Sequence, residues 1–287
     1  MTTLPATPTD APAEPEISYR ASGGKPSLRK ARVDLVEGMR RWPLWMHLAW
    51  QDIRLRYRGS ILGPFWITLS MGIMIGAMGL MYSQLFKMET KSYMPFLATG
   101  LLMWTFLASL INEGCVAFTN AEGFIKQVRL PFSLHVYRVL GRNLIVLAHN
   151  AVIYVLVALF YDITPSYTLL FLPLSLMIIL LNAAWVIFLL GMFCARFRDI
   201  GPIVSSLVQV IFFLTPVIWM PGQLRGHQAW VADLNPFYHF IELVRAPLLD
   251  QPLPPMALPM IAAITVVGWA ITIVVLRRWR SRLAYWV

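Results

Sequence analysis

The sequence has little charge and almost no cysteine. Charged residues make up 13% of its 287 residues and hydrophobic residues 58%, whereas soluble domains carry about 25% charged residues. Its two cysteines, Cys115 and Cys194, lie in or beside apolar blocks and lack metal-ligand spacing, so neither a disulfide framework nor a zinc site is indicated. With a mean hydropathy of +0.63, the composition excludes an ordinary soluble domain and indicates a membrane protein with several spans.

The motifs of nucleotide binding and hydrolysis are also missing. Gly23-Gly24-Lys25 is followed by Pro26 and belongs to no GxxxxGK[ST] loop, and neither HExxH nor GxSxG occurs. We therefore expect no cofactor or metal on this chain and no enzymatic activity of its own. His149 beside Asn150 is more typical of an interhelical hydrogen bond than of a proton relay. Without acidic residues inside the spans, a proton- or sodium-coupled transporter lacks its usual carboxylates.

Basic residues outnumber acidic ones, which gives a formal net charge of +10. In so apolar a chain this charge is better explained by lysines and arginines kept on the cytoplasmic side than by nucleic-acid binding. Of the 24 lysines and arginines, 20 fall in the segments predicted to be inside. The four outer ones are Lys87, Lys91, Arg225 and Arg245. The imbalance predicts that both termini are cytoplasmic.

The chain divides into three parts. Residues 1–27 are rich in Pro, Ala, Thr and Ser and predict a disordered cytoplasmic tail. In residues 28–60 tryptophans are interspersed with arginines, a pattern that predicts an amphipathic interfacial segment. Residues 61–287 form the predicted transmembrane domain, an all-α integral membrane fold. Its six spans are expected at about residues 65–86, 93–116, 144–161, 167–193, 201–220 and 256–276.

One further short helix is predicted before the last span. Asn235 precedes Pro236, which is the pattern of an N-cap followed by proline at the first helical position. The amphipathic stretch then runs to Asp250 and is too short to cross a bilayer. We expect a re-entrant or interfacial helix on the outer side.

The stretch Asn120–Arg142 is a basic, amphipathic island between two apolar blocks. Its five charged residues would each cost roughly 2.5–3.5 kcal/mol at the bilayer centre, so we expect the island to face water. These residues are Glu122, Lys126, Arg129, Arg138 and Arg142. Pro131 is expected to divide the island into two short helices, and apolar residues such as Phe124 and Ile125 favour a docking surface over a solvated loop.

Six motifs, in order along the chain, carry a family resemblance. They are DIRLRYRGSILGPFW (52–66), FIKQVRLP (124–131), FRDI (197–200), FFLTPVIW (212–219), LNPF (234–237) with Arg245 downstream, and RLAYWV (282–287). Together they resemble the membrane subunit of ABC-2-type polysaccharide exporters, which include O-antigen, capsule and polyol-phosphate permeases. The resemblance covers about residues 35–287.

This resemblance implies partners, a location and site residues. It implies a homodimer in the bacterial inner membrane with two copies of a separate ABC ATPase subunit, which holds ATP and Mg, and export of a lipid-linked glycan. The residues implied to couple to the ATPase are Glu122, Phe124, Lys126, Arg129, Leu130 and Pro131, together with the region of residues 40–58. Two rival functions remain: an ABC-2 permease for a drug or small lipid, and a membrane-embedded transferase, which would need convergent carboxylates or histidines.

A route for the substrate is also predicted. An anionic pyrophosphate-linked lipid would be attracted to Arg54, Arg56, Tyr57 and Arg58, where the basic segment joins the first span. Aromatic rings stack weakly and tolerate changes of register, so they suit a sliding glycan. The candidate channel aromatics are Tyr82, Trp104, Phe106, Trp219, Phe237 and Tyr238.

The topology is testable with single cysteines and an impermeant thiol reagent added to intact cells. Cysteines at Lys87, Ser166 and Gly226 are expected to react from outside, and cysteines at Gln127 and Ser281 are expected to stay unlabelled. Labelling at Gln127 would overturn both the six-span arrangement and the docking surface.

Overall fold

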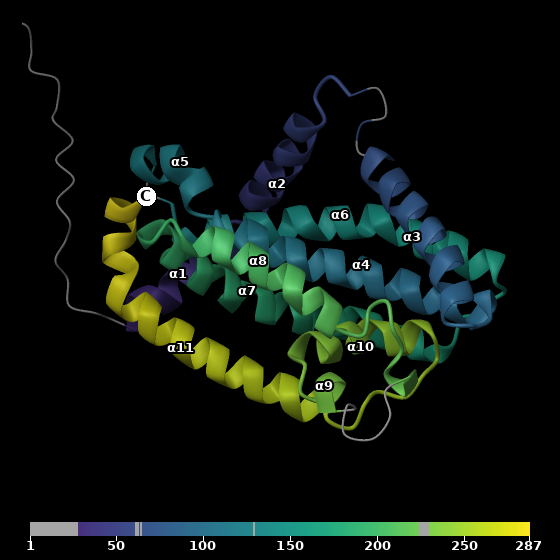
Figure 1. Cartoon of the computed structure of the whole chain (residues 1–287). Helices are drawn as coiled ribbons and strands as arrows, with labels where there is room; N and C mark the ends of the chain where they lie inside the picture. Colours follow the sequence, from purple (N-terminus) through teal and green to yellow (C-terminus); the bar gives the residue numbers. More distant parts are fainter. Residues whose placement is uncertain (1–27, 61–62, 64, 129, 224–229) are drawn as a thin grey trace, which may run out of the picture.

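The computed structural model describes residues 28–60, 63, 65–128, 130–223 and 230–287 (Figure 1). All regular elements of these residues are helical. The α-helices are α1 (Leu28–Arg40), α2 (Trp42–Arg56), α3 (Phe65–Leu85), α4 (Thr90–Cys115), α5 (Glu122–Gln127), α6 (Phe132–Phe160), α7 (Leu172–Arg196), α8 (Ile200–Leu214), α9 (Trp230–Asp233), α10 (Pro236–Leu248) and α11 (Ala257–Trp286). Three 3-10 turns, η1 (Thr119–Ala121), η2 (Tyr167–Phe171) and η3 (Pro221–Gln223), complete the order.

Five of the described helices are long and apolar enough to cross a membrane. They are α3, α4, α6, η2 with α7, and α11 up to Arg280, and they match five of the six predicted spans. The remaining span was predicted at residues 201–220, but α8 has 15 residues and is only about 22 Å long, against a hydrocarbon core of about 30 Å. The helix ends at Leu214, before the predicted end of this span, because Thr215 is extended and precedes Pro216, which disfavours helical geometry in the preceding residue.

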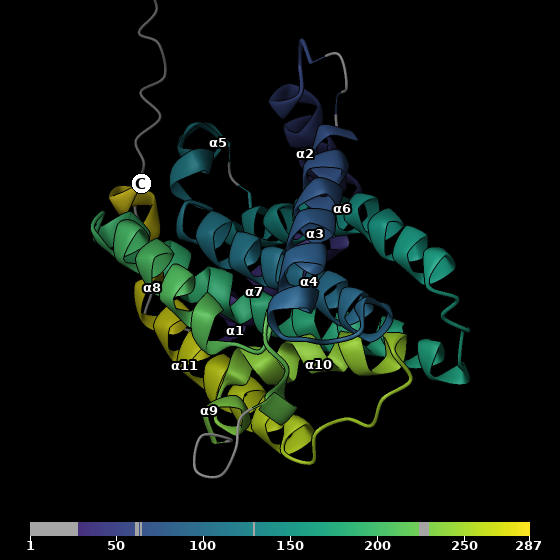
Figure 2. The same cartoon turned by 45° about the vertical axis from the view of Figure 1, so that its right-hand side comes forward.

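Helix α4 is the centre of the bundle. Of its most apolar window 78% is buried, against 17% for α3, α6 and α11. It packs against α3, α6, α7, α8 and α10, and the two cartoon views show it surrounded by these helices (Figures 1 and 2). Small residues let α7 approach closely: a Cβ at Gly191 would lie 2.8 Å from the ring of Phe118, just beyond α4. The apolar outer faces of α3 and α8 are left uncovered by this single chain.

Helix α6 begins well before the predicted start of the third span. It starts at Phe132, directly after Pro131, and continues without a break to Phe160. Arg138 and Arg142 thus lie about 9 and 15 Å along a spanning helix, given a rise of 1.5 Å per residue. The prediction of two short helices was correct for α5 and wrong for the second piece.

Helix α10 is folded into the bundle against α4, α7 and α11. Its predicted cap is confirmed, because the side-chain oxygen of Asn235 accepts from the backbone N–H of Phe237 at 2.9 Å and of Tyr238 at 3.4 Å. Asn235 also donates to Thr215 at 2.9 Å, which ties the start of α10 to the end of α8. The helix therefore packs with protein on several sides.

Arg245 of α10, which was counted among the outer charges, is fully buried. Its Nη1 donates to Glu242 at 2.7 Å and to the carbonyl of Pro216 at 3.0 Å, and the guanidinium lies 3.8 Å above the Phe96 ring. Gly100 leaves the necessary space, since a Cβ there would lie 2.2 Å from Nη2. Arg245 is thus enclosed by protein and paired with a carboxylate one helical turn away; its place on the outer side of the membrane stays a prediction.

Removal of one partner of this pair should destabilise the protein strongly. Arg245→Ala or Glu242→Gln leaves an uncompensated buried charge, which costs about 3–5 kcal/mol. The exposed Glu37–Arg41 pair is the control, and Glu37→Gln should cost no more than about 1 kcal/mol. Denaturant unfolding in detergent checks both; equal losses would show that the Glu242–Arg245 pair contributes no more than a surface pair.

Candidate functional site

Helix α5 stands off one end of the bundle, beside the C-terminal end of α11 (Figures 1 and 2). Ile125 is buried and anchors the helix, while Phe124 and Val128 are 41% and 47% exposed. Lys126 pairs with Glu122 at 2.5 Å on the same helix and holds the pKa of that carboxyl below its usual value. The helix therefore presents an apolar and charged surface, on which the Phe124 ring lies 5.7 Å from the Arg138 guanidinium.

The connection from α5 to α6 is fixed by Asp34 of α1. Asp34 is 3% exposed, and its carboxylate accepts from the backbone N–H groups of Ser133 at 2.9 Å and Phe132 at 3.3 Å. These are orphan donors of the first turn of α6, where a negative charge is also favoured by the helix dipole. Arg280 of α11 donates to the same carboxylate at 2.7 and 2.8 Å. One carboxylate thus joins α1, α6 and α11 beside the point where α5 leaves the bundle.

Close packing strengthens the contact between α1 and α6 at Asp34. The Ser133 hydroxyl donates to the backbone carbonyl of Asp34 at 2.6 Å. A Cβ at Gly38 would lie 2.0 Å from that hydroxyl, so α1 reaches α6 only because residue 38 is glycine. Sequence reasoning missed Asp34; the available signal was an acidic residue between two apolar ones, Val33 and Leu35, on a mainly basic helix.

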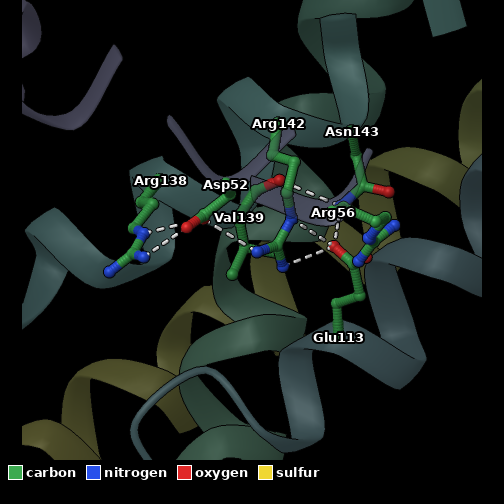
Figure 3. Close-up of polar contacts among 7 residues, drawn as sticks. All are labelled: Asp52, Arg56, Glu113, Arg138, Val139, Arg142 and Asn143. Atoms are coloured by element: carbon green, nitrogen blue, oxygen red, sulfur yellow. Dashed lines mark hydrogen bonds and ion pairs between the residues drawn. The ribbon is translucent and has the colours of Figure 1, made fainter. Parts of the chain in front are cut away.

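A second cluster joins α2, α4 and α6 (Figure 3). Asp52 of α2 accepts from Arg138 Nε at 2.8 Å and from Arg142 Nη1 at 2.9 Å. Glu113 of α4 accepts from Arg142 Nη2 at 2.7 Å and from Asn143 Nδ2 at 2.6 Å. The four charged side chains are 13–19% exposed. The expectation that Arg138 and Arg142 face water was wrong, because two carboxylates from other helices neutralise them inside the protein.

Arg56, predicted to attract the substrate, belongs to the edge of this cluster. Its side chain is half exposed, and Nη2 donates to Glu113 at 3.0 Å. Partial burial acts to lower the pKa of Arg56, but the hydrogen bond and charge of Glu113 outweigh this effect and raise it above its usual value. Arg54 and Arg58 are exposed and have no ion pair among the described residues, and Tyr57 is half-buried. These two arginines remain free to attract an anion.

The other predicted site residues are dispersed. Leu130 is half-buried and Pro131 buried in the connection to α6, and Arg129 lies outside the described residues. Among the aromatics, the Trp104 ring lies 5.5 Å from that of Phe237 and 5.3 Å from that of Phe212.

Phe237 also borders a cavity of about 270 Å³ between α4, α7 and α10. Phe106 and Tyr238 are buried, Tyr82 stacks on Phe86, and Trp219 donates to the Phe213 carbonyl. Their role in a channel stays a prediction.

A comparison with protein families identifies the class of this bundle. The family described as ABC-2 type transporter matches residues 43–249, which run from α2 to the end of α10. The chain belongs to the ABC-2 type transporter family. It is accordingly a transport permease and not an enzyme, a multi-pass protein of the inner membrane, and it depends on an ATPase partner.

Similar ABC-2 permeases share modest identity with this chain. An "O-antigen export system permease protein RfbA" of Myxococcus xanthus is 24% identical over 227 residues, which cover 78% of this chain and 87% of that protein. Two proteins of the same name from Klebsiella pneumoniae are 24% and 22% identical over 196 residues, covering 67% of this chain and 74% of each relative. The shared region includes most of both proteins.

The cluster of Figure 3 predicts graded effects of substitution. Arg142→Gln leaves two carboxylates short of a partner and should cost about 2–3 kcal/mol, somewhat below the ~3–5 kcal/mol of a fully buried pair. Arg56→Gln, at the exposed edge, should cost at most about 1 kcal/mol. Denaturant unfolding measures both, and a smaller cost for Arg142→Gln than for Arg56→Gln would contradict the assignment of Arg142 as the bridge.

Proposed function

We propose that this ABC-2 permease exports a lipid-linked cell-surface polysaccharide of the O-antigen type. It works as a homodimer with two copies of a separate ATPase subunit, on which ATP and Mg are bound. The names of the three relatives support the cargo class. The observation that carries the coupling role is the exposed helix α5, anchored by Ile125 and joined directly to the start of a spanning helix.

The contact between Asp34 and Arg280 supports a six-span topology with both termini cytoplasmic. It brings α1, which precedes the spans, together with the end of α11, the last helix. An odd number of crossings would leave these two elements on opposite sides of the membrane. The chain from Ile200 to Met220, helical in its first part, supplies the crossing that makes the number even. The basic residues at this end favour the cytoplasm, so α1 and α2 are proposed to lie at the inner interface.

Force from the ATPase is proposed to enter at α5 and pass to α6. The glutamate and lysine of α5 and its exposed Phe124 offer a contact of the kind that docks a partner subunit. Because only four residues separate the end of α5 from the start of α6, a displacement of α5 acts on the first turn of α6. Asp34 holds that turn to α1 and α11, and the cluster around Arg142 holds the next turns to α2 and α4. A short external helix is thereby linked to four helices of the bundle.

The substrate is proposed to reach the permease near the junction of α2 and α3. Arg54 and Arg58 are exposed there, with Arg56 and Tyr57 between them. Unpaired arginines attract an anionic lipid-linked sugar at about 1 kcal/mol each near the membrane surface. Beyond this point, aromatic contacts of about 0.5–1.5 kcal/mol, such as those a sugar would make with Trp104 and Phe237, are weak enough to let a chain slide.

The proposal is tested by ATP hydrolysis of the complete complex in vesicles. Lipid-linked glycan should stimulate hydrolysis by the native complex, and Phe124→Asp should abolish this stimulation while the permease stays folded, because a charge introduced at a protein contact costs several kcal/mol. Phe124→Leu, which keeps an apolar side chain, is the matched control and should retain stimulation.

Two outcomes would contradict the proposal in different ways. Normal export by Phe124→Asp would remove α5 from the contact with the ATPase. Stimulation by a drug or small lipid, without any response to glycan, would favour the rival cargo while leaving α5 as the coupling helix.

A further inference from the structure

A cavity of about 540 Å³ lies between the N-terminal helices and the bundle. Its walls come from α1, α2, α6, α7 and α11, and they are almost entirely hydrophobic. The volume falls within the ~300–1,000 Å³ of typical ligand pockets. Four residues of the wall, Val36, Met39, Met177 and Leu181, are exposed, so the cavity is open to the outside of the bundle. In a membrane protein, that side is occupied by lipid.

Two tryptophans of this wall have indole N–H groups without an acceptor. Nε1 of Trp45 and Nε1 of Trp269 are both buried and have no hydrogen-bond partner among the described residues. Indole is a donor only, and buried donors are almost always satisfied. The hydroxyl of Tyr137, in the same wall, donates to the Leu35 carbonyl at 3.2 Å, and Trp185, which borders another cavity, donates to Asn182 at 3.0 Å. A ligand that is mainly apolar but carries an oxygen acceptor would complete the site.

Arginines flank the exposed part of the cavity. Arg32 and Arg40 lie four residues before and after Val36, and residues four apart on a helix are neighbours on one face. Both are exposed, and neither forms an ion pair among the described residues. The next arginine, Arg41, is already paired with Glu37. The free charges at the rim therefore favour an anionic headgroup.

We propose that this cavity binds an acyl chain of an anionic membrane phospholipid. The lipid's ester oxygens supply the acceptors that Trp45 and Trp269 lack, and its phosphate lies at Arg32 and Arg40. The bound lipid fills the space between α1–α2 and the bundle and so supports the helix that carries Asp34. This role is independent of the cargo that the permease exports.

Native mass spectrometry of the full-length permease provides the test. Protein is reconstituted with equal amounts of phosphatidylglycerol and phosphatidylcholine, extracted, and washed with delipidating detergent. The native chain should retain phosphatidylglycerol, and Leu181→Trp, which fills the cavity from its exposed wall, should reduce retention at least fivefold.

A second cavity of about 560 Å³ between α4, α6, α7 and α10 provides a matched control. Two of its polar wall groups are satisfied internally, since Tyr154 donates to the Leu248 carbonyl at 2.5 Å and Thr99 to the Pro95 carbonyl at 2.9 Å. Leu159 is an exposed leucine of that wall, as Leu181 is of the first. Leu159→Trp should leave retention unchanged.

The rim is tested separately with surface variants that do not threaten folding. Arg32→Gln with Arg40→Gln should lower the preference for phosphatidylglycerol over phosphatidylcholine at least fivefold. Arg29→Gln with Lys30→Gln, two residues that are exposed on the same helix, should leave it unchanged. The proposal would be overturned if Leu181→Trp retained as much phosphatidylglycerol as the native chain, or if Leu159→Trp lost as much of it as Leu181→Trp. It would also be overturned if the Arg32→Gln, Arg40→Gln variant kept the native preference, or if the retained mass were that of a glycolipid and not of a phospholipid.

Discussion

The neutralisation of two arginines on α6 is the constraint on which this end of the protein depends. A spanning helix that carries Arg138 and Arg142 is tolerated only if opposite charges come from neighbouring helices. Asp52 and Glu113 supply them from α2 and α4. In satisfying this requirement the cluster also holds α2 against the bundle. The basic N-terminal segment is therefore part of the packed structure as well as a candidate interfacial element.

Asp34 places a second constraint on α6, at its first turn, a few residues before Arg138. Its carboxylate binds two backbone N–H groups of α6 and the guanidinium of Arg280, all of which are charge-assisted hydrogen bonds of the stronger kind. The two carboxylate sites fix successive turns of the same helix, one at its first turn and one further along. Because α5 is attached to that first turn, the proposed ATPase contact acts on a helix whose neighbours are already joined to it.

Local patterns predicted much of this fold. The apolar runs gave five spanning helices, and the Asn-Pro pair gave the cap of α10. Local patterns failed where a charge is neutralised by a partner distant in sequence. The start of α6 was misplaced because hydropathy excludes Arg138 and Arg142 from a span, and the carboxylate that neutralises Arg138, on Asp52, lies 86 residues away in the sequence. The burial of Arg245 was not predicted, although Glu242 stands three residues before it, a spacing that signals a helical ion pair. For the docking surface, α5 matches the predicted island, whereas its role in coupling stays a proposal.

The two ends of the bundle differ in how easily their ion pairs can rearrange. The Glu242–Arg245 pair is 7% and 0% exposed and is enclosed by Phe96, Gly100 and the Pro216 carbonyl. Separating it would leave charges in a medium of low dielectric, which is costly. The cluster around Arg142 is less enclosed, with Arg56 half exposed at its edge, and contains three arginines for two carboxylates, so one guanidinium can replace another with each carboxylate remaining paired. The movement of α5 proposed above therefore meets a lower electrostatic barrier at the end where α5 is attached than at the enclosed Glu242–Arg245 pair.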